Sequence, residues 1–137
     1  MTSIVLKGRE IPLIYTTYEM KAVQEEIAPL SVAFKILTGQ NPDDPEDKSQ
    51  YGSAKHLEAM AKLIQILGNA GLEETGQEPN LTEKGIMRAM KPNDLIRAFN
   101  ECMNAISEGM SSEIPEKETG PVDVTLEEMK KKEVKVG

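Results

Sequence analysis

The sequence predicts an α+β protein that is mostly α-helical, with an N-terminal β-hairpin packed on a small bundle of four to five helices and a disordered C-terminal tail. Three observations support this class. Two short apolar stretches flank Gly8, apolar residues recur at helical spacing through the middle of the chain, and apolar residues become sparse from Ser111 onward. The predicted domains are therefore residues 1–110, hairpin plus helices, and residues 111–137, a flexible charged tail.

A hairpin is predicted at the start of the chain, where residues 7–10 separate the two apolar stretches of residues 3–15. Gly8 can adopt a positive φ without steric cost, which a tight hairpin turn requires. Pro12 lacks an amide hydrogen, so it belongs at a sheet edge or at an outward position. Because a two-stranded ribbon alone is barely stable, the hairpin must pack on its own helices or pair with another chain, and the sequence is compatible with both.

The first helix is predicted to begin at Thr16, because Thr16 and Glu19 form a capping-box pattern. Pro29 interrupts or redirects the helix, and a helical period then continues to Gly39. The next stretch, residues 40–50, is acidic, contains two prolines and lacks long apolar side chains, so we expect a solvated loop.

Ser53 precedes a strongly amphipathic segment with apolar residues at i, i+3, i+4, i+7 and i+10 from Leu57. The glycines at 68 and 71 predict the end of this helix, with one of them in a left-handed cap position. A polar loop is expected over residues 72–80.

Two further helices are expected before the tail. Thr82 is predicted to cap a short helix that Pro92 ends. The last helix is predicted to start near Asn93, and it has the clearest amphipathic pattern of the chain. Its apolar positions are Leu95, Ile96, Phe99, Cys102, Met103 and Ile106.

The tail from residue 111 contains seven acidic residues and five lysines, and prolines interrupt it. This composition predicts disorder in isolation. Residues 125–128 nevertheless form a second capping-box pattern ahead of Met129, so a short helix could form there on contact with a partner.

Composition restricts the classes of function. The net charge of −7 argues against nucleic-acid binding, which requires clustered Lys and Arg, and the basic run at 130–132 is flanked by glutamates. No apolar run approaches the roughly 20 residues that cross a bilayer, and no secretory segment precedes the first strand. A lone cysteine excludes an internal disulfide and suits a reducing compartment. We therefore expect no membrane or nucleic-acid partner and a cytoplasmic location.

Few residues are suited to catalysis or metal binding. His56 and Cys102 are the only histidine and cysteine, which removes the usual metal clusters and Cys–His pairs. We expect His56 at the surface or its boundary, and Cys102 as a buried, inert thiol. The acidic residues 43–47 are interpreted as a solvated loop rather than a cation site, because they lack the EF-hand order. The sequence therefore predicts no enzyme, no catalytic residue, no cofactor and no metal.

Two features favour protein binding instead. Flexible methionine side chains can line adaptable binding surfaces, and the exposed part of the last two helices is the predicted site, together with the tail. The residues predicted to bind a protein are Met87, Met90, Met103 and Met110. The alternative is that these methionines fill gaps in a small core. The hairpin edge is a second candidate surface, for another strand or a second copy.

The order of these features is similar to that of the tail assembly chaperones of long-tailed bacteriophages and prophages of Gram-positive hosts. The hairpin at residues 4–14, with its Lys-Gly-Arg turn, and the capped helix at 16–27 match the family's opening. Leu-Thr-Glu at 81–83 and the helix at 94–108 resemble its closing helices. The resemblance covers about residues 3–110 and is one of layout, without an invariant signature.

The resemblance implies a non-enzymatic chaperone in the cytoplasm of the bacterial host. Such proteins bind the coiled-coil-prone tape-measure protein, keep it soluble and assist tail tube subunits that polymerise around it. It also implies that a translational frameshift can append a second domain. Two alternatives remain: a virion structural component, such as a minor tail or connector protein that forms a homo-oligomeric ring, and a small enzyme or cation-binding regulator that uses residues 43–47.

Overall fold

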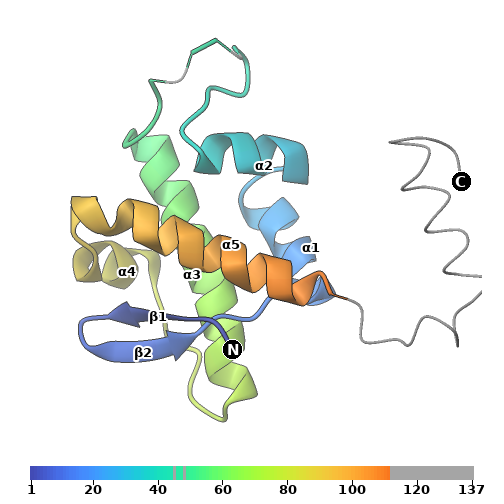
Figure 1. Ribbon diagram of the computed structural model, residues 1–137, viewed down its shortest axis with the longest axis vertical. Helices are drawn as coiled ribbons and strands as arrows, with labels where there is room; N and C mark the ends of the chain where they lie inside the picture. The colour runs from blue at the N-terminus through green and yellow to red at the C-terminus, as the bar shows by residue number, and fades with distance from the viewer. Residues whose placement is uncertain (45, 48, 112–137) are drawn as a thin grey trace, which may run out of the picture.

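The computed structural model describes residues 1–44, 46–47 and 49–111 (Figure 1). An antiparallel hairpin precedes the helices, which confirms the predicted α+β, mostly α, fold class. The elements are β1 (Ser3–Leu6), β2 (Arg9–Pro12), α1 (Thr17–Glu26), α2 (Leu30–Leu37), α3 (Ala54–Glu74), α4 (Glu83–Ala89), the 3₁₀ turn η1 (Pro92–Asp94) and α5 (Leu95–Gly109). The predicted disordered tail lies outside the described residues, apart from Ser111.

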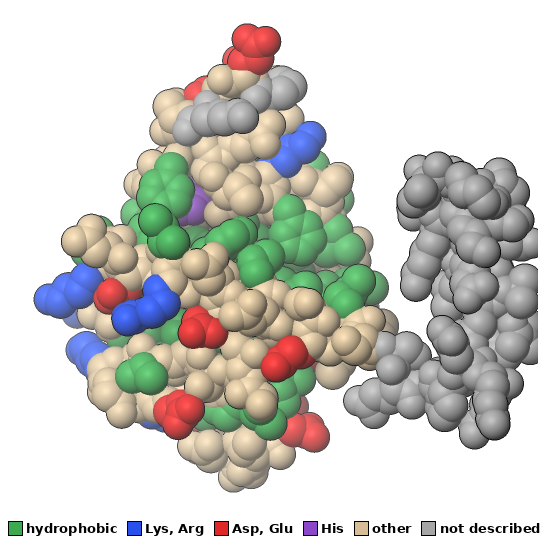
Figure 2. All heavy atoms as spheres, in the orientation of Figure 1, with side chains coloured by type: hydrophobic (Ala, Val, Ile, Leu, Met, Phe, Trp, Pro, Cys, Tyr) green, Lys and Arg blue, Asp and Glu red, His purple; other side chains and the backbone are tan. Residues whose placement is uncertain are grey.

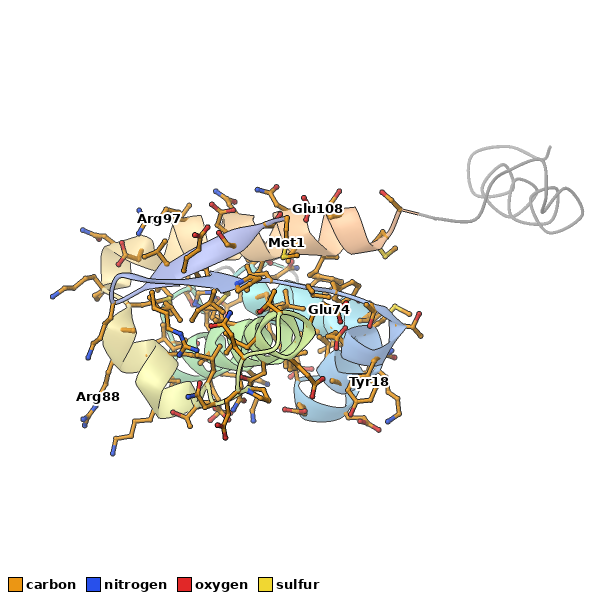
Figure 3. All side chains as sticks on the ribbon, turned by 90° about the horizontal axis from the view of Figure 1, so that it is seen from below. Met1, Tyr18, Glu74, Arg88, Arg97 and Glu108 are labelled. Atoms are coloured by element: carbon orange, nitrogen blue, oxygen red, sulfur yellow. The ribbon has the colours of Figure 1, made fainter. Side chains whose placement is uncertain are left out.

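The long helix α3 is the centre of the fold. The helices α1, α2, α4 and α5, together with β2, all pack against it, and α5 also contacts β1. Figure 3 shows α5 and the hairpin on one side of α3, with α1 and α4 at its two flanks. Several residues of α3 are fully buried in the core that results, among them Ala61, Leu63, Ile64, Leu67 and Leu72.

The hairpin packs on its own helices, which was one of the two arrangements that the sequence left open. Lys7 and Gly8 have φ values of 50° and 77°, so a two-residue turn with positive φ at both positions joins the strands. Val5 faces outward, whereas Ile4, Leu6 and Ile11 on the other face of the ribbon are buried. After β2, the Ile14 amide donates to the Leu67 carbonyl of α3 over 3.1 Å, which attaches the hairpin to the central helix.

The predicted helix starts are confirmed. Thr16 and Glu19 form the reciprocal capping box of α1. The side chains of Ser53 and Thr82 accept amide hydrogens at the starts of α3 and α4. Pro29 separates α1 from α2.

The predicted end of the third helix is wrong. The helix continues through Gly68 and Gly71 to Glu74, and the left-handed glycine is Gly76, with a φ of 77°. Gly71 serves a close contact instead, because a Cβ at this position would lie 1.9 Å from the Pro12 carbonyl oxygen. Glycine here permits the close approach of β2 to α3.

The expectation for His56 is also wrong. This side chain is only 2% exposed. Its Nδ1 accepts a hydrogen bond from the Gly52 amide at 2.9 Å, and its Nε2 donates to the Leu37 carbonyl at 3.1 Å. A neutral imidazole therefore joins the end of α2 to the start of α3, and it satisfies both ring nitrogens without water.

Candidate protein-binding site

The helix α5 has an apolar arc that is wider than its contact with the rest of the protein. One row of the arc, Leu95, Ala98, Cys102 and Ala105, is buried against the core. A second row lies beside it, which we call the α5 stripe: Ile96, Phe99, Met103, Ile106 and Met110. At 100° per residue the two rows together cover about 180° of the helix, whereas an ordinary amphipathic face needs little more than about 100°.

The α5 stripe is only partly covered. Ile96 and Met110 are 64% and 67% exposed, and the three residues between them are partly buried against the core. Figure 2 shows hydrophobic side chains gathered in a band between α2 and α5. The α5 stripe therefore lies on a side of the molecule where apolar side chains are accessible to solvent.

An apolar pocket adjoins the N-terminal end of the α5 stripe. Its volume is about 300 Å³, and it lies where the ends of α3, α4 and α5 meet. The residues that line it are Gly52, Leu57, Met87, Met90, Lys91, Pro92 and Leu95. We call it the Met87–Met90 pocket. Leu95 lines the pocket, and Phe99 of the stripe lies one turn further along α5, where residues four apart are neighbours on the helix surface, so the two features adjoin along α5.

The structure divides the four predicted binding residues into two pairs. Met87 is 39% exposed and lines the pocket with Met90, which is partly buried. Met103 is partly buried and Met110 is exposed, and both belong to the α5 stripe. Met103 and Met110 do not line the pocket, so the two pairs lie at different places along one apolar surface.

Sequence reasoning missed two parts of this surface. Leu57 and Leu95 were assigned only to amphipathic helix faces, yet both line the pocket. Ile96 was assigned to the same stripe as buried Cys102, yet it is largely exposed. The available signal was the width of the apolar arc of α5, which exceeds what one helix contact can cover.

The charges near the site are unevenly distributed. Lys91 and Arg97 lie at the junction of α4, η1 and α5, and Figure 2 shows Lys and Arg side chains gathered there beside the apolar band, whereas Figure 3 shows Arg88 on the opposite side of the molecule from Arg97. Among the described residues, only Arg97 of these three forms an ion pair, with Asp94 at 3.2 Å. Figure 3 shows Glu108 at the other end of α5, away from Arg97. The pocket therefore lies at the basic end of the surface.

The residues considered for chemistry have other roles. Burial raises the pKa of the Cys102 thiol to about 12, so it stays protonated and unreactive in the folded protein. The Asp47 carboxylate accepts hydrogen bonds from the Ser49 hydroxyl at 2.6 Å and the Ser49 amide at 2.9 Å, which lower its pKa to about 2. These bonds hold the turns of the acidic loop. The part of the chain that the structure describes contains no group of three His, Cys, Asp or Glu side chains placed to hold a metal ion.

Comparisons with protein-family models, with curated proteins and with solved structures find no match to this chain. Within the described residues, none of the helices has the length and apolar character to span a bilayer. The function is therefore inferred from the residues of the site and their geometry.

Proposed function

We propose that this protein is a non-enzymatic chaperone that binds the apolar face of a helical partner, as phage tail assembly chaperones bind the tape-measure protein. The observation that carries the proposal is the α5 stripe, an apolar row on a well-formed helix that the fold leaves accessible. Contiguous exposed apolar surface often marks a protein-binding site, whereas single scattered apolar residues do not.

The spacing of the stripe suits a helical partner. Its residues alternate by three and four positions, which is the a and d spacing of a coiled coil. The residues along its open flank, Asn100, Asn104 and Ser107, are polar and uncharged. A second helix could pack along this row without facing a fixed charge, and the partner's own heptad stripe would be covered.

The Met87–Met90 pocket supplies an anchor point for the same partner. An enclosed cavity of about 150 Å³ is large enough to bind benzene, so this open pocket of about 300 Å³ has room for a large aliphatic or aromatic side chain. Binding energy at protein interfaces concentrates in buried anchors of this type. The flexible thioethers of Met87 and Met90 could adjust to different anchors.

The proposed partners follow from the resemblance to tail assembly chaperones. The tape-measure protein is the proposed client, the tail tube protein is the proposed second partner, and the cytoplasm of the bacterial host is the proposed location. The net charge of −7 would keep a complex with an aggregation-prone client soluble, and it disfavours nucleic acid as a partner.

The test is co-expression with the large helical protein encoded directly downstream, followed by pull-down and a soluble-fraction assay. We expect the partner to co-purify and to stay soluble only with this protein. Ile96→Glu should abolish both effects, because it places a charge in the exposed row. The matched control is Gln24→Glu, which adds the same charge at an exposed position of α1, outside the α5 stripe and the pocket. Equal loss in both variants, or no interaction with the native protein, would contradict the proposal.

A virion structural component is the second candidate, and the hairpin is the observation in its favour. The described sheet has two strands, so each has an outer edge without a neighbouring strand, and Val5 of β1 is 58% exposed. Such edges could join subunits into a closed ring. Ring-sized particles on light scattering, together with presence of the protein in purified virions, would favour this function over a chaperone.

A further inference from the structure

We propose that residues 122–129 of this same chain occupy the Met87–Met90 pocket and the adjoining end of the α5 stripe when no partner is bound. The inference rests on the proposed function, since it assigns an internal competitor to the partner site. The occupant is identified by its charge, its apolar residues and its reach.

The pocket requires an apolar segment with acidic neighbours. Its walls are apolar apart from Lys91, whose ammonium forms no ion pair with any described carboxylate. Arg97 lies at the same junction and already pairs with Asp94 at 3.2 Å, whereas Arg88 lies on the opposite side of the molecule (Figure 3). An acidic segment would supply the carboxylate partner that Lys91 lacks among the described residues, and charge-assisted bonds to a carboxylate are the strong ones.

Residues 122–129 have the complementary composition. They read Val-Asp-Val-Thr-Leu-Glu-Glu-Met, with four apolar and three acidic residues and no basic residue. Leu126 and Met129 have side chains of a size suited to the pocket. Asp123, Glu127 and Glu128 supply carboxylates for Lys91, and the lysines at 130–132 follow the segment.

The connecting chain is long enough. The pocket lies at the start of α5, and the 15 residues of this helix span about 22 Å. Residues 112–121 can span up to about 33 Å when extended, so residue 122 can reach the pocket from the end of α5.

Attachment to the same chain makes a weak contact sufficient. A tethered segment has an effective concentration in the millimolar range, so it needs only millimolar affinity to cover the pocket. A client with a long apolar stripe would displace it by covering the whole α5 stripe. The free protein would then shield its apolar site from other copies of itself.

The test uses the full chain with a nitroxide label at Gly120→Cys and NMR of labelled methionine methyl groups. Cys102 is fully buried, so the thiol reagent selects the new cysteine. We expect the label to broaden Met87 and Met90 more than Met20. This order is informative because Met20 belongs to α1, whose first residue, Thr17, lines one pocket with Glu108 and Gly109 at the C-terminal end of α5. Stronger broadening of Met20 than of Met87 would overturn the inference.

Two variants of the labelled chain test the contacts. Leu126→Ser and Lys91→Glu should each abolish the selective broadening of Met87, whereas Lys35→Glu, an exposed charge reversal on α2, should leave it unchanged. Methyl shifts of Met60, which is buried in the core, report whether each variant is folded. Broadening of Met87 that persists in Leu126→Ser would contradict the assignment of the segment.

Partner binding separates this inference from the proposed function. If the segment covers the site about nine-tenths of the time, Leu126→Ser should bind the helical partner about tenfold more tightly than the native chain. Unchanged binding of a partner that still depends on Ile96 would overturn the inference and leave the chaperone function standing. Loss of partner binding in all variants, the native chain included, would instead overturn the chaperone function.

Discussion

Gly109, in the last turn of α5, lies directly against the backbone carbonyl of Tyr15. A Cβ at position 109 would be 1.9 Å from the Tyr15 oxygen, so the end of α5 touches the link between β2 and α1 without a side chain between them. This contact holds the α5 stripe in position relative to the hairpin.

Gly109→Ala should therefore destabilise the protein by about 1 to 3 kcal/mol, because the backbone of α5 or of the link must move. This loss outweighs the gain of about 1 kcal/mol in helix propensity that alanine brings. Urea unfolding followed by circular dichroism measures the effect. Ser107→Ala, at an exposed position of the same helix, is the control, and equal stability of the two variants would show that the contact is not close.

Two glycines of α3 offer a matched comparison. Gly71→Ala places a methyl group 1.9 Å from the Pro12 carbonyl oxygen, which belongs to the backbone. Gly68→Ala places it 2.5 Å from the Leu81 Cδ1, a side-chain methyl group that can rotate away. We expect Gly71→Ala to lower the free energy of unfolding more than Gly68→Ala in the same urea assay. The reverse order would mean that β2 adjusts more easily than Leu81.

The methionines of the binding surface should respond differently to charge. Met87→Glu should change the free energy of unfolding by no more than about 0.5 kcal/mol, because Met87 is partly solvated on α4. Met103→Glu should cost about 1 to 3 kcal/mol, because Met103 is packed against the core. Thermal and urea unfolding of both variants check this. Equal tolerance would place Met103 at the surface.

Stability should depend on pH through His56. Burial lowers the pKa of His56 in the folded protein, while the unfolded chain keeps a value of about 6.5. As the pH falls below about 6.5 the unfolded chain takes up a proton first, so the free energy of unfolding falls by up to about 1.4 kcal/mol per pH unit until the folded pKa is reached. Above this range the contribution is constant.

Urea unfolding of the native chain and of His56→Gln at pH 7.5 and pH 5.5 isolates this effect. The variant keeps a polar side chain but cannot titrate in this range, so the stability advantage of the native chain should shrink at the lower pH. A difference between the two proteins that is independent of pH would show that His56 is protonated as easily in the folded chain as in the unfolded one.

The local features of this fold can be predicted from neighbouring residues alone. The turn at Gly8, the capping box of Thr16 and Glu19, and the caps Ser53 and Thr82 each depend on residues within a few positions of one another. The burial of Cys102 also followed from its place in a helical period. Turns and helix caps can be predicted from the sequence because the backbone geometry that they specify involves only a few consecutive residues.

The other features of the fold depend on contacts between residues far apart in the chain. Glycine ends many helices, so Gly71 could be recognised as a point of close approach only with Pro12 of β2 in place. His56 is buried because the Leu37 carbonyl, nineteen residues earlier, accepts its Nε2 hydrogen. The apolar arc of α5 was visible in the sequence, but the position of α3 and β1 determined which half is covered and left Ile96 exposed. Each outcome depends on which distant residue lies opposite, and helical periodicity carries no information about that neighbour.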